Sequence, residues 1–540
     1  MDADRYNASG PPLPGSMKIA AIDLGSNSIH LVIVEVRPSG GFHVVASEKE
    51  MVRLGATTLA RGHLSAAAMA RGLEVLRKYK RLCQSQRVDK ILAVATSAVR
   101  EARNGEDYLM RIGQKTGIWP RVASGEGEAR LIYLAALHSI HLEGRRALIV
   151  DVGGGSVELA HGTGTKPDWV ASEKLGVLRM AERFSRHDPL AGKDEERLEA
   201  FVEAAMAPHE DAIKAARPFC AIGTSGTILA LGRLAHQMET GEDQESLNQI
   251  TVKAATLAEL RESLTRQSLR ERLRVPGMDE PRADILPVGA VLLDTILRRF
   301  GIEELVLCEW ALREGILLDY IHRHPRTLAR AEAYPDVRRR SVMALAERCQ
   351  YEEAHARHTA ELSLQLFDAT RARHGLGDAE RSLLEYAALL HDIGHHISYP
   401  GHHKHTYYLI KNGDLRGFHP AEVEVLANVA RYHRRGHPRK KHPGFGGLPK
   451  PARRVVQVLA GLLRVADALD RSHKQVVRRI AVSERQGVLR LQAEARGDCE
   501  LELWGVGGRV ALLEETLDLR LRIETAPLAA PSPRRALLRA

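Results

Sequence analysis

The sequence predicts an α/β protein with two similar lobes, followed by an all-helical domain and a small β-rich module. Two strand–turn–strand segments each carry an aspartate before a glycine turn, Asp23 and Asp151, and 128 positions separate them. Apolar residues then recur with helical spacing over 341–473, and with a spacing of two from Ala481. The repeated hairpin indicates a duplicated unit whose two halves face each other.

The composition excludes several classes of protein. With 540 residues, 27% charged and 44% hydrophobic, the chain fits folded soluble protein rather than disorder, collagen or coiled coil. The five cysteines are scattered and form no CxxC pair, which argues against a disulfide framework or a zinc ribbon. Residues 1–16 lack the apolar core of a secretory signal, and no apolar run approaches the length of a membrane span. We therefore expect a cytoplasmic protein that does not bind membranes.

The chain is basic, with a net charge of +10. This charge favours a polyanionic partner, and by itself it fits nucleic acid, acidic lipid and phosphate polymers equally well. Aromatic residues make up only 4% of the chain, so the stacking platforms of single-stranded nucleic-acid binders would be scarce. We expect no nucleic-acid partner.

The expected first lobe covers 17–130, after a flexible tail over 1–16. It begins with the hairpin KIAAIDLGSNSIHLVIVEV and continues with the strand KILAVATSAV and a helix over 100–113. The expected second lobe covers 131–322. It contains the hairpin RRALIVDVGGGSVELAHG, the turn and helix CAIGTSGTILALGRL, and a last helix over 311–321.

The basic, proline-containing stretch HRHPRTLARAEAYPDVRRR marks the next boundary. We expect the helical domain over 323–475 and the β-rich module over 476–525. In that module VLRLQAEAR and CELELW alternate apolar and polar residues, which is typical of strands. The remaining 526–540 read as a second flexible tail.

Three glycine turns are candidates for binding phosphate: DLGSNS from Asp23, DVGGGS from Asp151 and GTSGT from Gly223. Glycine lets backbone N–H groups approach a phosphate closely, and a leading aspartate can hold Mg²⁺. A single turn of this kind is usually an ordinary hairpin turn, but two in matching contexts favour a phosphate cleft between the lobes. The expected phosphate-binding residues are Asp23, Gly25, Ser26, Asn27, Ser28, Gly153, Gly154, Gly155, Ser156, Gly223, Thr224, Ser225 and Gly226.

The segment between the hairpins offers catalytic candidates. Glu126 and Glu128 lie at the start of a helix, where carboxylates compensate the helix dipole. Alternatively, Glu128 is a general base that deprotonates a water beside the phosphate. Arg100 and Arg103 follow a strand end, where they hold phosphate oxygens or form surface salt bridges.

Residues 18 to about 320 resemble the exopolyphosphatase and guanosine pentaphosphate phosphohydrolase family, within the superfamily of actin, sugar kinases and acetate kinase. The matching segments, in the family's order, are DLGSNSIHLVI, ATSAVREA, SGEGEARLIYLA, LIVDVGGGSVEL, SEKLGVLRM, IGTSGTI and ALREGIL. The resemblance implies two actin-like, ribonuclease H-like lobes and a homodimer.

The resemblance also implies roles for single residues. Glu128 would be the catalytic base and Arg100 a phosphate-binding arginine. Asp151 and Glu158 would help bind metal or water, and Asp23 with the glycine turns would hold phosphate and Mg²⁺ or Mn²⁺. Gly127 departs from the family, since related proteins often carry a second acidic residue at this point.

The helical domain is rich in histidine, with 14 of the 25 histidines between His355 and His473. His358, His391, Asp392 and Asp467 resemble the metal-binding pattern of HD phosphohydrolases, which implies a divalent transition metal held between helices. His405 and His433 would complete a second metal position. The alternative is an HD fold kept for its shape alone.

Residues 431–454 contain nine Lys or Arg and no acid. Such a run is a solvated loop, or a basic groove that gains affinity for a phosphate polymer by counterion release. We favour the groove, with Arg434, Arg435, Lys440 and Lys441 in contact with the chain.

These observations predict an exopolyphosphatase that releases terminal orthophosphate from inorganic polyphosphate by Mg²⁺-assisted water attack, with Glu128 as the base. Hydrolysis of guanosine pentaphosphate is the nearest alternative. An ATP-driven switch or sugar kinase, and a non-catalytic polyphosphate or alarmone sensor, are the other candidates. A second hydrolase site in the HD-type domain is compatible with the first prediction.

Overall fold

The structure is a computed structural model, and it describes residues 17–36, 42–55, 62–142, 144–324, 336–485 and 487–527. The chain divides into two compact units, Met1–Val337 and Arg338–Ala540. The expected N-terminal tail and most of the C-terminal tail lie outside the described residues. Within the described ranges, no helix is both long enough and apolar enough to cross a lipid bilayer.

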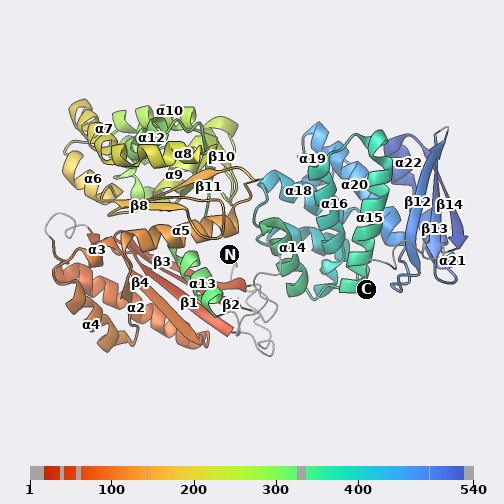
Figure 1. Cartoon of the computed structure of the whole chain (residues 1–540), viewed down its shortest axis with the longest axis horizontal. Coiled ribbons are helices and arrows are strands. Elements are labelled where there is room, and N and C mark those ends of the chain that lie inside the picture. The colour runs from red at the N-terminus through yellow and green to blue at the C-terminus, as the bar shows by residue number, and fades with distance from the viewer. Residues whose placement is uncertain are drawn as a thin grey trace. The chain divides into compact units, whose positions relative to one another are not determined.

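The first unit contains a five-stranded sheet in the order β3-β2-β1-β4-β5 (Figure 1). Its strands are β1 (Met17–Leu24), β2 (Ser28–Val36), β3 (Phe42–Met51), β4 (Lys90–Ala95) and β5 (Arg121–Val122). Strand β2 runs antiparallel to both β1 and β3, whereas β4 pairs in parallel with β1 and β5. Runs of Val, Ile and Leu bury these strands, as expected for a sheet covered by helices.

A six-stranded sheet repeats this plan in the order β10-β11-β9-β6-β7-β8. Its strands are β6 (Ala147–Val152), β7 (Val157–His161), β8 (Trp169–Glu173), β9 (Cys220–Thr224), β10 (Thr251–Lys253) and β11 (Glu304–Leu307). The hairpin β6–β7 continues antiparallel to β8, and β9 pairs in parallel with β6, as β4 does with β1. Asp151 faces Glu158 across this hairpin, and Asp23 faces His30 at the same register in β1–β2. The expected duplicated hairpin is therefore present.

Helices surround both sheets. Around the first sheet these are α2 (Ala66–Ser85), α3 (Ser97–Arg100) and α4 (Gly105–Thr116). The helices of the second half are α5 (Gly125–Ser139), α6 (Val177–Phe184), α7 (Gly192–Met206), α8 (Glu210–Ala216), α9 (Gly226–Thr240), α10 (Ala254–Arg266), α11 (Leu269–Arg272), α12 (Leu286–Arg299) and α13 (Leu312–Arg323), with 3₁₀ turns η1 (Ala207–His209) and η2 (Glu280–Arg282). Polar caps fix several helix starts; in α5, for example, the Ser124 hydroxyl accepts from the Gly127 amide.

Helices α5 and α13 cross between the two halves. Helix α5 follows the first sheet but packs against β7 and β8, whereas α13 follows the second sheet but packs against β1. The two helices also contact each other, and a side chain at Gly315 would collide with the Leu131 carbonyl, 2.1 Å from the position of its Cβ. Helix α13, at the end of the expected second-lobe range, therefore lies on the first sheet. Helix α5 in turn covers strands of the second sheet.

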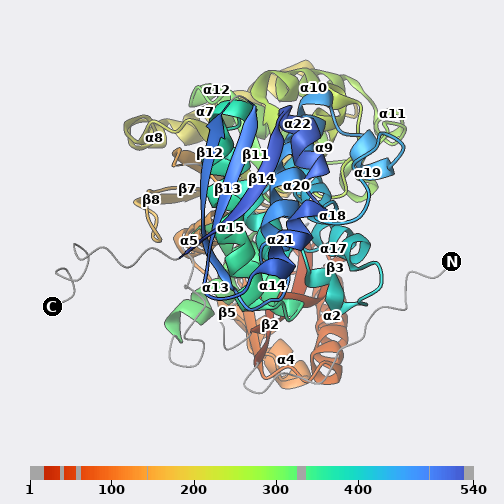
Figure 2. The same ribbon diagram turned by 90° about the vertical axis from the view of Figure 1, so that its right-hand side faces the viewer.

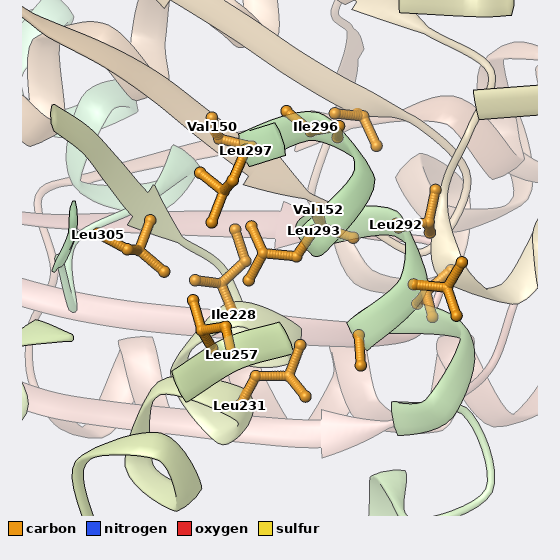
Figure 3. Packing of buried hydrophobic residues seen from close by; sticks show 14 of the residues in the cluster. Val150, Val152, Ile228, Leu231, Leu257, Leu292, Leu293, Ile296, Leu297 and Leu305 are labelled. Carbon is orange, nitrogen blue, oxygen red and sulfur yellow. The ribbon is translucent and has the colours of Figure 1, made fainter. Parts of the chain in front are cut away.

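The largest core of the first unit surrounds α12, whose residues 286–297 are all buried. Figure 3 shows Leu292, Leu293 and Ile296 of this helix in one cluster with side chains such as Val152 of β6 and Leu231 of α9. A helix that is apolar on every side must be enclosed on every side. This core holds the second glycine hairpin on a rigid support.

The second unit begins with helices. They are α14 (Val337–Arg348), α15 (Glu353–His374), α16 (Asp378–Leu390), α17 (His402–Lys411), α18 (Pro420–Arg431), α19 (Pro443–Gly446) and α20 (Lys450–Ala468), with the 3₁₀ turn η3 (Ile393–His396). Helix α20 is buried from Val458 to Ala468 and packs against α15, α16 and α18. The expected helical region is confirmed.

A three-stranded sheet completes the second unit, in the order β12-β13-β14 (Figure 2). Its elements are β12 (Val477–Arg485), β13 (Val488–Ala495), α21 (Glu500–Gly507), α22 (Ala511–Leu517) and β14 (Arg520–Pro527). The prediction of a strand for CELELW is wrong, because this segment forms helix α21. There the Glu502 side chain turns inward and accepts from the Ser472 amide, while Leu501 and Trp504 are exposed. An alternation over six residues does not distinguish such a short helix from a strand.

Candidate active site

The two glycine turns meet at the tips of the hairpins β1–β2 and β6–β7. The hydroxyls of Ser26 and Ser97 lie 2.8 Å apart, and Ser26 Oγ also accepts from the Ala98 amide. A side chain at Gly155 would lie 2.3 Å from Ser97 Oγ, and one at Gly154 would lie 3.1 Å from Ser26 Cβ. Glycine is required here because the turns approach each other closely.

A cavity of about 290 Å³ opens between these turns. It collects residues from both halves of the unit. Those expected from the sequence to bind phosphate, metal or water that line it are Asp23, Gly25, Ser26, Asn27, Ser28, Glu128, Asp151, Gly153, Gly154, Ser156, Glu158, Ser225 and Gly226. Asp23, Glu128 and Asp151, which are far apart in the sequence, therefore share one opening.

Four carboxylates concentrate negative charge in this cavity. Burial, together with repulsion from Glu158, raises the pKa of Glu128 and that of Asp151 well above their usual range. Burial also raises the pKa of Asp23, to about 7, although Arg313 opposes the shift. The pKa of Glu158 is raised by burial as well, against a hydrogen bond from the Ser172 hydroxyl of 2.8 Å. Several buried carboxylates without enough compensating charge favour protons or a cation.

The donor set fits a divalent cation. The Oδ1 atoms of Asp23 and Asn27 are buried, and among the described residues they find no hydrogen-bond partner. Such oxygens are the ligands that Mg²⁺ prefers, usually together with several waters. Three ligand atoms within 4.8 Å of one another occur, among the described residues, only in the second unit. Water would therefore complete the coordination of an ion held by Asp23, Asp151 and Glu158.

Glu128 lies in the first turn of α5 and is 4% exposed. Its Oε1 accepts a hydrogen bond from Arg100, whose guanidinium also donates to the Ala123 carbonyl at 2.7 Å. Arg100 opposes the rise in the pKa of Glu128, which burial and Glu158 cause. The pair places a cation and a candidate base next to the same cavity.

A cationic wall, which we define as Lys49, Arg282 and Arg313, also lines the cavity together with His30. Arg313 donates to His30 Nδ1 at 2.8 Å, and His30 Nε2 donates to Ser28 Oγ at 2.7 Å. Burial and Arg313 hold the pKa of His30 well below its usual range, so the ring is neutral and directs the Ser28 hydroxyl. Desolvation and repulsion from Arg282 lower the pKa of Lys49 to about 8. The sequence did not predict this wall. Arg313 belongs to the family-like segment ALREGIL, but no role was expected for it.

Four of the expected residues do not line the cavity. Gly155 packs against Ser97, and Arg100 reaches the site through Glu128. Gly223 packs against Ile228 and Leu305, and the Thr224 hydroxyl donates to the Trp310 carbonyl at 2.7 Å. Gly223 and Thr224 belong to β9, so they hold the strand whose following turn brings Ser225 and Gly226 to the cavity.

The second unit brings His391, Asp392 and Asp467 together, but not His358. His358 Nε2 donates to the Val477 carbonyl at 2.7 Å, which joins α15 to β12. The assignment of His358 to this cluster is therefore wrong, and His355, one helical turn earlier, takes its place. Of the two further histidines considered, His433 lies beside Asp392, whereas on α17 it is His402 that faces the cluster rather than His405.

The basic residues of the expected groove have different surroundings. Arg435, Lys440 and Lys441 are exposed, whereas Arg434 is half-buried with its guanidinium 3.3 Å from His402 Nε2. A polyanion-binding role for the three exposed side chains stays a prediction.

Comparison with known proteins identifies both units. The model of the Ppx/GppA phosphatase family matches residues 32–324, and that of Ppx/GppA phosphatase domain III matches residues 337–504. The match to domain III leaves the HD assignment of the helices as a prediction.

The solved structures that are similar to this chain include members of the same family. An exopolyphosphatase from Cytophaga hutchinsonii shares 30% identity over 56% of this chain and 98% of that one, with a TM-score of 0.53. The Aquifex aeolicus member of the Ppx/GppA family shares 27% identity over 57% of this chain and 98% of that one, with a TM-score of 0.50. The α/β, actin-like lobes expected from the sequence are thereby confirmed.

Proposed function

Because the chain belongs to the Ppx/GppA phosphatase family, we propose that it is an exopolyphosphatase, which releases orthophosphate from the end of inorganic polyphosphate. The observation that supports this most directly is the shared cavity, where Asp23, Asp151 and Glu128 face one opening between two glycine turns. The end of a phosphoanhydride chain carries dense negative charge. A site for it needs cations, backbone amides and one group that activates water.

Glu128 is the general base in this proposal. Its carboxylate accepts a proton from a water, and the resulting oxygen attacks the terminal phosphorus while the bond to the bridging oxygen breaks. Arg100 holds Glu128 in place and keeps its pKa lower than burial alone would. As the terminal phosphate enters, the same guanidinium can bind one of its oxygens.

The other parts of the cavity bind and orient the chain. The two glycine turns hold the terminal phosphate with backbone amides, and Ser28, directed by His30, donates its hydroxyl. Asp23, Asp151 and Glu158 hold Mg²⁺ or Mn²⁺, which neutralises charge on the phosphate oxygens when bound. The cationic wall binds the next phosphates of the chain, since Lys49, Arg282 and Arg313 each present a positive charge to the cavity.

Guanosine pentaphosphate is a second candidate substrate, because it also ends in a phosphoanhydride. The cationic wall favours polyphosphate: it offers three charges for consecutive phosphates, whereas the described cavity lining has no aromatic ring other than His30 for a guanine to stack on. The cytoplasmic location and the homodimer expected from the sequence stay predictions.

The test measures orthophosphate release from long-chain polyphosphate, guanosine pentaphosphate and ATP side by side, with Mg²⁺ present. The proposal predicts the highest kcat/KM for polyphosphate. A higher value for guanosine pentaphosphate would assign the alarmone as substrate, and a higher value for ATP would favour a nucleotide-driven switch. Tight polyphosphate binding without any release would identify a sensor.

A further inference from the structure

Four imidazoles and two carboxylates converge inside the second unit, in a group that the proposed reaction does not use. We call it the His–Asp cluster; its members come from five segments and are His355 on α15, His391 and Asp392 after α16, His402 on α17, His433 after α18 and Asp467 on α20. The four imidazoles are only 1–2% exposed. Asp392 is 22% exposed, so the cluster is open to solvent on the side of this carboxylate.

The cluster divides into two trios around Asp392. In the first, His355 Nε2 and His391 Nε2 are 3.2 Å apart, and they lie 3.5 and 3.7 Å from Asp467 Oδ1. In the second, the Nε2 atoms of His402 and His433 lie 3.1 and 3.4 Å from Asp392 Oδ1. The other oxygen of Asp392 lies 3.6 Å from His391 Nε2. Asp392 therefore presents one oxygen to each trio.

Each imidazole is anchored through the nitrogen that faces away from the cluster. The Nδ1 atoms of His391 and His433 donate to the carbonyls of Ala388 and Ala430, both at 2.7 Å. His355 Nδ1 donates to Asp470 Oδ2 at 2.8 Å. His402 Nδ1 lies 2.7 Å from His395 Nε2 and 3.1 Å from the Tyr399 carbonyl. Such outer partners fix the ring orientation and the tautomer of metal-binding histidines.

This anchoring turns the inner nitrogens of the rings toward one another. His355 Nε2 and His391 Nε2 are 3.2 Å apart, and His402 Nε2 and His433 Nε2 are 3.3 Å apart. A carbonyl or carboxylate oxygen can only accept, so a neutral ring with such a partner carries its proton on Nδ1 and offers the lone pair of Nε2 to a cation. Two imidazole nitrogens at this separation are close enough to bind one metal ion.

We propose that the His–Asp cluster holds two divalent transition-metal ions that share Asp392 as a bridging ligand. His355, His391 and Asp467 bind the first ion, and His402 and His433 bind the second. Imidazole with carboxylate suits zinc, iron or cobalt better than magnesium. The site is therefore chemically different from the oxygen-rich cavity of the first unit.

The ligand class of this centre is a phosphoryl oxyanion. Arg434 lies next to the second trio, with Nη1 3.3 Å from His402 Nε2, and Arg509 donates to the outer oxygen of Asp467 beside the first trio. Two ions close together bind an anion that bridges them, and a guanidinium at each end suits the oxygens of a phosphoryl group. Inorganic phosphate is the simplest probe.

The first experiment counts ions. The full chain without a histidine tag is titrated with Co²⁺ in a large excess of Mg²⁺, which occupies the oxygen ligands of the first unit. The visible absorption of imidazole-bound Co²⁺ and elemental analysis after gel filtration should both give two ions per chain. One ion or none would overturn the dinuclear centre, and the cluster would then be a network of hydrogen bonds.

Matched variants test the ligand set. His402→Gln should lose one ion, whereas His405→Gln, on the same helix but outside the cluster, should keep two. His355→Gln should lose an ion that His358→Gln retains, and Asp392→Asn should lose both. Circular dichroism confirms that each variant is folded. Retention of both ions by Asp392→Asn, or equal losses within a matched pair, would overturn the assignment.

The second experiment measures inorganic phosphate binding by calorimetry, with and without Co²⁺. The difference in binding heat between the wild type and Asp392→Asn reports phosphate binding by the second unit alone. Arg434→Gln should weaken this component about tenfold while both ions remain bound, and its exposed neighbour Arg435→Gln should not. Phosphate binding that is unchanged by Co²⁺ would contradict an anion bridging two ions.

Discussion

Arg100 and Glu128 form an ion pair at the edge of a cavity that already holds three other carboxylates. In the proposed reaction this pair would couple phosphate binding to water activation, because one guanidinium would serve both the base and the incoming phosphate. When a phosphate oxygen accepts one of the Arg100 N–H groups, the charge of Glu128 would be less compensated and the carboxylate would be a stronger base. Substrate entry would then prepare Glu128 for proton transfer.

Replacing Arg100 by Ala should shift the pH profile of the reaction. Arg100 lowers the pKa of Glu128, so its removal lets burial and Glu158 raise that pKa further. Glu128 must be deprotonated to act, and the acidic limb of kcat/KM should therefore move to higher pH. Arg103→Ala is the control, since Arg103 is exposed three residues beyond α3. A parallel loss at every pH, with no displacement of the limb, would assign Arg100 to phosphate binding alone.

Lys49 should make polyphosphate binding weaken as the pH rises through about 8. Desolvation and Arg282 lower its pKa to about 8, so the ammonium is charged below that pH and neutral above it. Wild-type KM should increase above pH 8, whereas kcat changes little because Lys49 does not touch the reacting atoms. In Lys49→Met, KM should be higher at pH 7 and the increase above pH 8 should be absent. An unchanged KM profile in this variant would remove Lys49 from the binding site.

Metal removal should destabilise the first unit more at high pH than at low pH. The pKa of Asp23 is raised from its usual range to about 7, so the folded state keeps a proton that the unfolded state has lost. The free energy of unfolding without metal should therefore fall as pH rises from about 4 to about 7. Mg²⁺ should restore it above pH 7 and have little effect at pH 5. The melting temperature, measured with Mg²⁺ and with EDTA at pH 5 and again above pH 7, checks this pH dependence.

The comparison with Asp23→Asn isolates this carboxylate. The variant carries no titrating group at position 23, so its pH dependence without metal should be flatter than that of the wild type. Equal slopes for the two proteins would assign the effect to Asp151, Glu128 or Glu158 instead.

Gly155→Ala should impair the site through the contact between the two turns. Its Cβ would lie 2.3 Å from Ser97 Oγ, so the hairpins would have to separate. We expect a fall in kcat of at least about tenfold, since a displaced turn no longer positions the phosphate. Adding Ser97→Gly removes the clashing hydroxyl and should recover part of the activity. If the double variant is no better than Gly155→Ala, this contact is not the cause.

The hairpins were predictable because their strands are rich in β-branched residues and their turns in glycine. The common opening of Asp23 and Asp151 followed from the duplication, which places the two aspartates at equivalent turns, whereas the family resemblance pointed to Glu128. The crossing of α5 and α13 was not predictable, since their apolar faces fit either sheet.

The other differences between the predicted and the observed site arise where the local sequence fits more than one arrangement. His355 and His358 both face inward from α15, and only the fold decides that one meets Asp467 and the other Val477. Lys49, Arg282 and Arg313 come from three segments without a common motif, so no spacing links them. The spacing of residues along the sequence does not reveal contacts between distant segments of the chain.

The central claim is that Glu128 activates the attacking water. Glu126 provides a matched control, because it lies two residues earlier on the same helix, 66% exposed and paired with Arg130. Orthophosphate release from long-chain polyphosphate at saturating substrate is the most direct measurement. Glu128→Gln should lower kcat by at least about 100-fold with little change in KM, whereas Glu126→Gln should behave like the wild type. A Glu128→Gln enzyme with normal kcat would contradict the mechanism.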